Sequence, residues 1–107
     1  MDPEKRKRLE AAGWRTSTVQ EFLDLTDEDM LYIETKIALG NALRRLRTAQ
    51  GLTQAQLARR IGSSQSRVAR METGDPSVTI DLVVQGLYAL GADREALGEI
   101  IAAGPTG

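Results

Sequence analysis

Four polar side chains whose chemistry suits contact with nucleic acid lie close together in the middle of the chain. They are Gln65, Ser66, Arg67 and Arg70. A Gln amide can pair with N6 and N7 of adenine, and an Arg guanidinium with O6 and N7 of guanine. Each good pair of this kind discriminates between bases by roughly 1–3 kcal/mol. Such chemistry requires a rigid element that presents these side chains together on one outward face.

The residues before this group predict a short helix from about residue 54 to residue 61. Thr53 precedes an apolar-periodic run, and Gln56 follows three residues later, which is the pattern of a capping box. In that pattern the Thr hydroxyl accepts a backbone N–H, and the Gln side chain reaches back to the cap. Gly62 ends the helix, because this position calls for a positive φ that glycine adopts without a Cβ clash.

A second helix is expected from about residue 65 to residue 73. Either Ser63 or Ser64 caps its N-terminus. Val68 and Met71 are three residues apart and therefore share one face of this helix, which we expect to point inward. The polar group is then left on the opposite, outward face.

The spacing within residues 53–74 predicts a helix-turn-helix, whose second helix enters the DNA major groove. Ala58 lies four positions before Gly62, and Val68 lies six positions after it. Two helices that cross steeply through a short turn bring their backbones close together, and a small side chain at Ala58 permits this approach. The alternative is that the two helices form a plain structural hairpin with no binding role. The polar outward face favours the DNA-binding interpretation.

The same stretch closely resembles the XRE family, the class of the phage lambda repressor and Cro. The matching residues are Leu52, Gln54, Leu57, Ala58, Gly62, Ser64, Gln65, Val68, Glu72 and Gly74. The resemblance is strong over about residues 36–90. It implies an all-α fold, namely a lambda-repressor-like five-helix DNA-binding bundle with an N-terminal helical extension, and double-stranded DNA as the partner.

The resemblance also implies which side chains contact DNA. These are Gln54, Ser64, Gln65, Ser66, Arg67 and Arg70. Gln65, Ser66 and Arg70 fall where phage repressors read bases. Gln54 falls where the family uses a Gln at a helix N-terminus to grip phosphate, and the free N–H groups there favour an anion. The remaining two are candidates for contacts to the DNA backbone.

Glu72 is the only acidic side chain expected near this surface. By the resemblance it pairs with an Arg on the preceding bundle helix, and Arg47 occupies that position. We therefore expect a structural Arg47–Glu72 ion pair that fixes the angle of the second motif helix. Many relatives carry basic residues just after that helix to hold phosphate, whereas this chain has Asp75-Pro76-Ser77. A contact there would have to come from backbone N–H groups.

The net charge is −1, but the charges are unevenly distributed along the chain. Residues 35–71 carry eight basic side chains and no acidic one, whereas both flanks are acidic. Phosphate contacts depend on the local field, which acts over about 10 Å at moderate salt. The middle of the chain therefore suits a polyanion. Arg59 and Arg60 lie at the far end of the first motif helix, and either phosphate contact or a solvated face explains them.

Before the motif, a helical pattern runs from Asp27 to about Ala49. Thr26 is its expected cap, and the carboxylates at residues 27–29 are stabilised by the positive end of the helix dipole. We prefer this interpretation to a metal or acid–base cluster. The apolar stripe changes phase near Gly40, which predicts a kink or a break there. The later half is expected to be the first helix of the bundle.

Residues 1–34 exceed what a minimal repressor domain needs. Trp14 is expected to dock with Phe22 and neighbouring apolar residues as a small lid on the core. Leu31 and Tyr32 either lengthen the core or build a dimer contact. The layout, a short Gly-Trp segment and then a helix leading into the repressor domain, looks like small antitoxin-type regulators of the HigA kind.

After the motif, Ser77 is expected to cap a helix that runs to about Leu90, and Asp93 a last helix that runs to about Ala102. The expected division of the chain is an N-terminal helical extension at residues 1–34, a DNA-binding domain at residues 35–102 with its motif at 53–74, and a disordered tail at residues 103–107.

The composition narrows the function further. The chain has no Cys and no His, which excludes thiol chemistry and leaves a zinc site or a nucleophile–His pair without its usual residues. No apolar run reaches the ~20 residues of a membrane span, and no secretory signal pattern opens the chain. We therefore expect a cytoplasmic protein that is not an enzyme and has no cofactor or membrane contact.

These observations favour a sequence-specific DNA-binding transcriptional regulator, a homodimer that acts as a repressor. The alternative is an antitoxin that masks a toxin protein through its N-terminal segment and autoregulates its operon. The two functions are compatible in one chain.

Overall fold

The structure is a computed structural model and describes residues 20–105. The chain divides into two units, one ending at Tyr32 and one starting at Ile33. All regular secondary structure over the described residues is helical, which confirms the all-α prediction. In this part of the chain no helix combines the length and the apolar character that a membrane crossing requires.

In the first unit, a helical turn at residues 20–23 precedes the start of α2 (Asp27–Ala49). Thr26 and Asp29 cap α2 reciprocally. The Asp29 N–H donates to Thr26 Oγ1 at 3.1 Å, and the Thr26 N–H donates to Asp29 Oδ2 at 3.0 Å. This exchange confirms the capping interpretation of the acidic first turn.

The apolar side chains of the first unit differ from the prediction. Phe22 is 86% exposed, so it does not belong to a lid on a core. Leu31 and Tyr32 are 64% and 52% exposed, so they do not lengthen a core either. Trp14, the proposed centre of the lid, lies outside the described residues.

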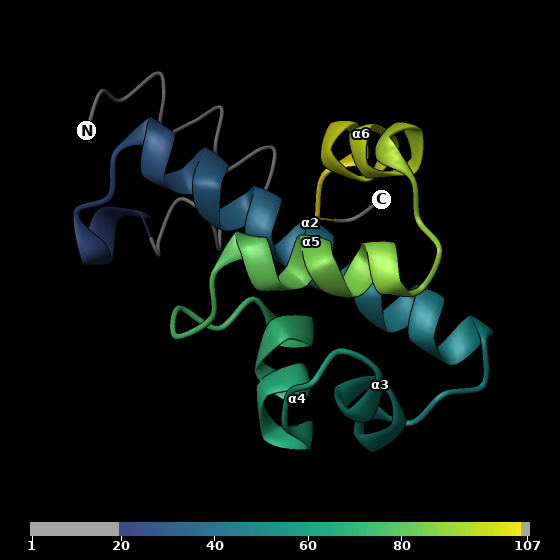
Figure 1. The fold of residues 1–107 in the computed structure, drawn as a ribbon. Coiled ribbons are helices and arrows are strands. Elements are labelled where there is room, and N and C mark those ends of the chain that lie inside the picture. The colour runs from purple at the N-terminus through teal and green to yellow at the C-terminus, as the bar shows by residue number, and fades with distance from the viewer. Residues whose placement is uncertain (1–19, 106–107) are drawn as a thin grey trace. The chain divides into compact units, whose positions relative to one another are not determined.

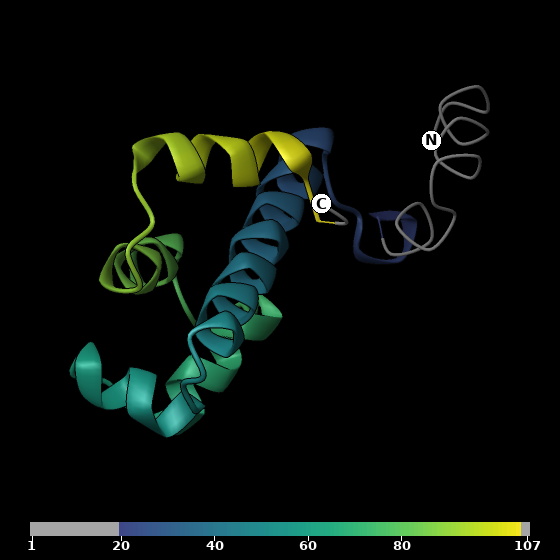
Figure 2. The ribbon, with the colours of Figure 1, turned by 90° about the vertical axis from the view of Figure 1, so that its right-hand side faces the viewer.

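The second unit contains the later part of α2 and four further helices. Their bounds are α3 (Gln54–Arg60), α4 (Gln65–Thr73), α5 (Ile80–Ala89) and α6 (Arg94–Ala103). Within this unit, α5 lies between the α3–α4 pair on one side and α6 on the other (Figure 1). The view turned by 90° shows the same order (Figure 2). This is the five-helix arrangement expected for the DNA-binding domain.

A single apolar core holds these helices together. Its largest fully buried side chains are Leu39 and Leu43 of α2, Leu57 of α3, Val68 and Met71 of α4, and Val83 and Leu87 of α5. α6 contributes no fully buried residue, but its Leu97 and Ile100 pack against this core. The core therefore fixes α3 and α4 directly against α2 and α5, whereas α6 covers it from outside.

α2 is continuous through Gly40, where the sequence predicted a kink or a break. A break is therefore ruled out. Gly40 is buried, and the backbone of α4 lies against it. The change of phase in the apolar pattern marks the place where α2 meets α4, because the residues on this side must be small rather than large.

The connections after α4 also differ in detail from the prediction. Ser77 does not cap α5, whose N-cap residue is Thr79 and lacks a side-chain capping bond. The Ser77 N–H donates instead to Asp75 Oδ1 at 2.8 Å and so closes a tight turn. Asp93 caps α6, as expected.

The end of the described chain belongs to the bundle. α6 includes Ala103, and Asn41 Nδ2 of α2 donates to the carbonyl oxygen of Pro105 at 2.9 Å. Residues 103–105 are therefore not part of a disordered tail, although the sequence placed them in one.

Candidate nucleic-acid interface

The turn between α3 and α4 is built from the local signals that the sequence contains. Thr53 and Gln56 form the predicted capping box at the start of α3, with both reciprocal bonds present. Gly62 has a φ of +67°, which a residue with a Cβ rarely adopts. Ser64, rather than Ser63, caps α4, and its hydroxyl accepts the Arg67 N–H at 3.1 Å. The open choice between the two serines is thus resolved.

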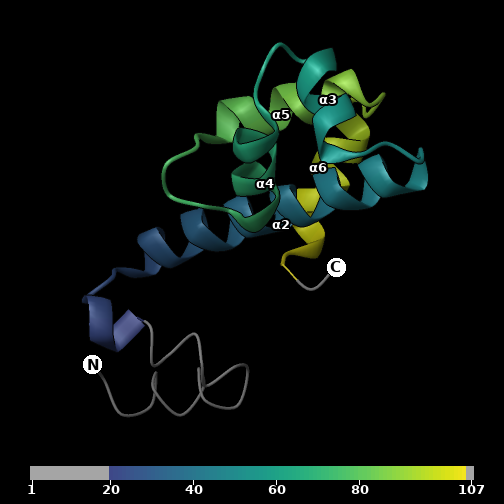
Figure 3. The same ribbon diagram turned by 90° about the horizontal axis from the view of Figure 1, so that it is seen from below.

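Apolar packing then fixes how α4 sits on α3. Ala58 and Leu57 of α3 and Val68 and Met71 of α4 are all buried. The two helices cross steeply, as the views from the front and from below both show (Figures 1 and 3). Because Val68 and Met71 fill the inner face of α4, its other side is turned away from the core.

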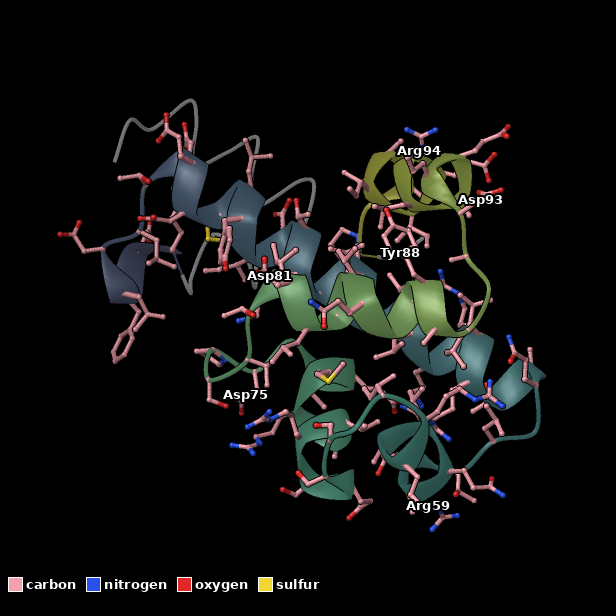
Figure 4. The ribbon with its side chains drawn as sticks, viewed as in Figure 1. Arg59, Asp75, Asp81, Tyr88, Asp93 and Arg94 are labelled. Atoms are coloured by element: carbon pink, nitrogen blue, oxygen red, sulfur yellow. The ribbon has the colours of Figure 1, made fainter. Side chains whose placement is uncertain are left out.

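The outward side of α4 carries the side chains predicted to recognise DNA. Gln65, Ser66, Arg67 and Arg70 are all exposed, and we call these four residues the α4 outer face. Arg59, near the end of α3, is also exposed and lies at the opposite end of the second unit from Arg94 of α6 (Figure 4). The side chains named as base-reading candidates therefore share one accessible surface.

An ion pair lies directly beneath this surface. Arg47 Nε donates to Glu72 Oε2 at 2.5 Å, and Arg47 Nη2 donates to Glu72 Oε1 at 3.0 Å. Arg47 Nη1 also donates to the carbonyl oxygen of Leu52 at 2.8 Å. The hydrogen bond to Glu72 raises the pKa of Arg47, although burial acts in the opposite direction. The expected structural pair is present, and it ties α4 to the end of α2.

Gln54 has a different environment from the one implied by the resemblance. We expected its side chain to be available for a phosphate. Instead its Nε2 donates to Glu72 Oε1 at 3.1 Å, and its Oε1 accepts from Gln65 Nε2 at 2.7 Å. Gln54 therefore connects the buried ion pair to the α4 outer face.

The loop Asp75-Pro76-Ser77, noted in the sequence for its lack of basic residues, brings an acidic side chain near the α4 outer face. Arg70 Nη1 donates to Ser77 Oγ at 3.4 Å, and Ser77 in turn bonds to Asp75. The hydrogen bonds from Ser77, first from its side chain and then from its backbone, lower the pKa of Asp75, with smaller contributions from the charges of Arg70 and Lys36. The turn from Asp75 to Ser77 is local, and an Asp before Pro-Ser is the signal for it. The placement of Ser77 beside Arg70 depends on how the chain leaves α4 and could not be predicted from the turn alone.

The geometry can support hydrogen bonding to base edges and to phosphates. The amide of Gln65 and the guanidinium of Arg70 project from one short helix, which has the width that a major groove admits. Glu72 is buried and neutralised by Arg47, so its charge does not oppose a polyanion at this surface. Asp75 is the exception, since it lies near Arg70.

Comparison with known protein families agrees with this geometry. A family model described as a helix-turn-helix domain matches residues 38–100, which is more than half of the chain. The chain belongs to this helix-turn-helix family. Comparisons with curated proteins and with solved structures found no match.

The match covers most of the second unit, including the whole helix-turn-helix. The bundle formed by α2–α6 is consistent with the lambda-repressor-like architecture, and α3 and α4 are its helix-turn-helix. A helix-turn-helix domain implies DNA as a partner and is typical of regulators that are not enzymes. The first unit lies outside the match, so its function must be argued from its own residues.

Proposed function

We propose that this protein is a sequence-specific DNA-binding transcriptional regulator that reads the major groove with α4. The observation that carries the proposal is the exposure of Gln65, Ser66 and Arg70 on one side of a helix whose other side is fully buried. In this assignment the Gln65 amide pairs with an adenine and the Arg70 guanidinium with a guanine. Ser66 contributes a third contact to a base edge.

Contacts to phosphate would set the position of α4 in the groove. Arg67 is exposed beside the base-reading residues, and the N-terminus of α4 supplies backbone N–H groups next to Ser64. Gln54 is half-buried and bonded on both sides, so its contact with phosphate would have to come from its remaining N–H. Arg59 is exposed near the end of α3, and we assign it a further contact with phosphate.

We further propose that two copies bind together and repress transcription. A dimer would place one α4 in each half of an operator with two-fold symmetry, and the half-sites would lie about 10 bp apart or a multiple of that distance. Binding across a promoter would then exclude other proteins from it. Light scattering of the free protein and of its complex with DNA would give the number of copies.

The test begins with the full chain and random DNA, from which bound sequences are selected. The Gln65→Ala, Arg70→Ala double variant should then bind the selected operator at least roughly tenfold more weakly. The reason is that each good contact between a side chain and a base contributes roughly 1–3 kcal/mol. Arg94→Ala is the matched control, since Arg94 is a basic residue of α6 on the other side of the unit (Figure 4). Equal affinity of the double variant and the control for the operator would overturn the assignment.

Arg67→Ala provides a second test of the same assignment. If Arg67 contacts a phosphate, its removal should weaken binding to all sequences alike. The slope of log affinity against log salt concentration should then become smaller by about one. Loss of sequence preference in this variant would instead make Arg67 a base-reading residue.

A second candidate function is that of an antitoxin-type regulator that binds a partner protein through its first unit. The exposure of Phe22, Leu31 and Tyr32 favours it, because a partner protein that covers them would bury large apolar side chains that water now surrounds. The full chain should then purify from its native cells with a stable partner, and Phe22→Ser together with Tyr32→Ser should release that partner without changing DNA affinity. Absence of any stable partner would remove this candidate.

A further inference from the structure

We propose that Asp75 is a specificity-determining residue that keeps Arg70 from binding phosphates and so reserves its guanidinium for a base. This inference rests on the proposed function, since it concerns how α4 distinguishes an operator from other DNA. Its starting point is the loop after α4, where an acidic turn lies directly beside a base-reading candidate.

The loop holds the guanidinium of Arg70 by hydrogen bonds. Arg70 Nη1 donates to Ser77 Oγ at 3.4 Å, and Arg70 Nε donates to the carbonyl oxygen of Ser66 at 3.4 Å. Ser77 is itself fixed, because its N–H donates to Asp75 Oδ1 at 2.8 Å. Arg70 is therefore turned toward the loop, although its side chain is exposed.

The carboxylate of Asp75 also acts on the charge of Arg70. Hydrogen bonds from the side chain and then the backbone of Ser77 lower the pKa of Asp75, and the charges of Arg70 and Lys36 lower it further. Asp75 is therefore ionised at neutral pH. Because Lys36 of α2 shares the field of this carboxylate, the charge of Arg70 is offset only in part.

A phosphate and a base edge respond differently to such an arginine. Phosphate binding is driven by charge and by the release of counterions, whereas base reading depends on N–H groups held in fixed directions. A guanidinium has five N–H groups, and the two internal bonds leave three of them. Two are enough for O6 and N7 of guanine. Asp75 thus weakens the contact that any DNA sequence offers and preserves the contact that guanine offers.

Asp75→Asn is the first variant that tests this assignment, because it removes the charge and keeps an acceptor for the Ser77 N–H. Asp93→Asn is the matched control. Asp93 Oδ1 likewise accepts a backbone N–H at 2.8 Å, that of Ala96, and Asp93 is well separated from Asp75 (Figure 4). Both variants change the net charge equally. Each full-length protein is titrated with the selected operator and with an unrelated duplex of the same length at several salt concentrations.

Asp75→Asn should bind the unrelated duplex roughly threefold more tightly, which is the scale of one exposed ion pair. The slope of log affinity against log salt concentration should become steeper by about 0.9, as expected for one added phosphate contact. Affinity for the operator should rise less, because Arg70 is engaged with a base there. The ratio of the two affinities should therefore fall in Asp75→Asn and stay constant in Asp93→Asn. An unchanged ratio in Asp75→Asn overturns the inference.

The Arg70→Ala, Asp75→Asn double variant decides whether Asp75 acts through Arg70. Compared with Arg70→Ala alone, the double variant should bind the unrelated duplex with nearly the same affinity and the same salt slope. A gain as large as that seen with Arg70 present would mean that Asp75 repels DNA by itself, and the inference would be wrong.

The same measurements separate the inference from the proposed function. If the chain selects no sequence from random DNA, the proposed function fails, and the salt slopes on the unrelated duplex still decide whether Asp75 restrains Arg70. If an operator is selected and its affinity ratio is the same with and without the charge of Asp75, the inference fails and the proposed function stands.

Discussion

The backbone of Gly40 in α2 lies directly against the carbonyl group of Met71 in α4. A Cβ at Gly40 would come within 2.5 Å of the Met71 carbonyl oxygen and within 3.1 Å of that of Glu72. Both atoms belong to the backbone, so neither can rotate away as the end of a side chain could. The position of α4, and with it the α4 outer face, is therefore set by a direct contact between two helix backbones.

We predict that Gly40→Ala destabilises the fold by about 1–3 kcal/mol, the usual range for overpacking a core. Alanine favours a helix over glycine by about 1 kcal/mol, but here the clash with backbone outweighs that gain. Chemical denaturation measures the change. Gly98→Ala in α6 is the control, since a Cβ at this position would meet nothing within 4 Å, and it should stabilise the protein. Equal changes in the free energy of unfolding for the two variants would show that α4 can move away from Gly40 without loss of stability.

The contrast between Gly40 and Gly62 explains how much of the fold could be predicted from the sequence. Gly62 follows a capped helix and precedes another cap, so its positive φ follows from its neighbours in the chain. Gly40 is small because of α4, which lies far along the sequence. The apolar pattern changes phase around Gly40, but only the fold shows that α4 packs against α2 at this position.

The same division applies to the candidate site. The outward placement of Gln65 and Arg70 follows from helical periodicity once Val68 is known to be apolar and buried. The bonds of Gln54 could not be predicted, because they depend on where the carboxylate of Glu72 comes to rest relative to α3. Sequence periodicity predicts which side of a helix is polar, and packing determines which of those polar groups meet.

We predict that Arg47→Met destabilises the protein by about 3–5 kcal/mol, because it leaves the buried charge of Glu72 uncompensated. Arg44→Met is the control, since Arg44 is exposed on the same helix and its loss should change stability by less than about 0.5 kcal/mol. The measurement is the free energy of unfolding in denaturant.

Replacing both partners, as Arg47→Met with Glu72→Leu, should recover most of the lost stability, because a buried ion pair is often matched by apolar groups of similar volume. The cost of the single substitution would then be the unpaired charge. If the double variant is no more stable than Arg47→Met, the lost packing and the bond to Leu52 account for the effect instead.

We predict that Thr53→Ala lowers stability by about 1 kcal/mol, since it removes the hydroxyl that caps α3. Thr79→Ala makes the same chemical change at the N-cap of α5, where the structure has no side-chain capping bond. That control should cost clearly less, and thermal unfolding of both variants gives the difference. Similar losses at the two positions would contradict the importance of the capping box for the helix-turn-helix.

Stability should also depend on the ionisation of Asp75 in acid. Its pKa is lowered in the folded protein, mainly by the hydrogen bonds from Ser77. A carboxyl group with a lowered folded-state pKa stabilises the fold at pH values above its unfolded pKa. This contribution should therefore be complete at neutral pH, begin to fade as the pH falls through about 4, and disappear below the folded-state pKa.

Asp75→Asn isolates this effect, because the amide oxygen can still accept the Ser77 N–H while the charge is removed. The free energy of unfolding of wild type should exceed that of Asp75→Asn at pH 7, and the two curves should converge as the pH falls below the ordinary range of aspartate. The side-chain carbon signal of Asp75 in nuclear magnetic resonance reports its titration directly. Parallel stability curves at all pH values, together with titration in the ordinary range, would mean that the Ser77 turn forms without help from the charge. In that case the position of Ser77 beside Arg70 would depend on the backbone of the loop alone.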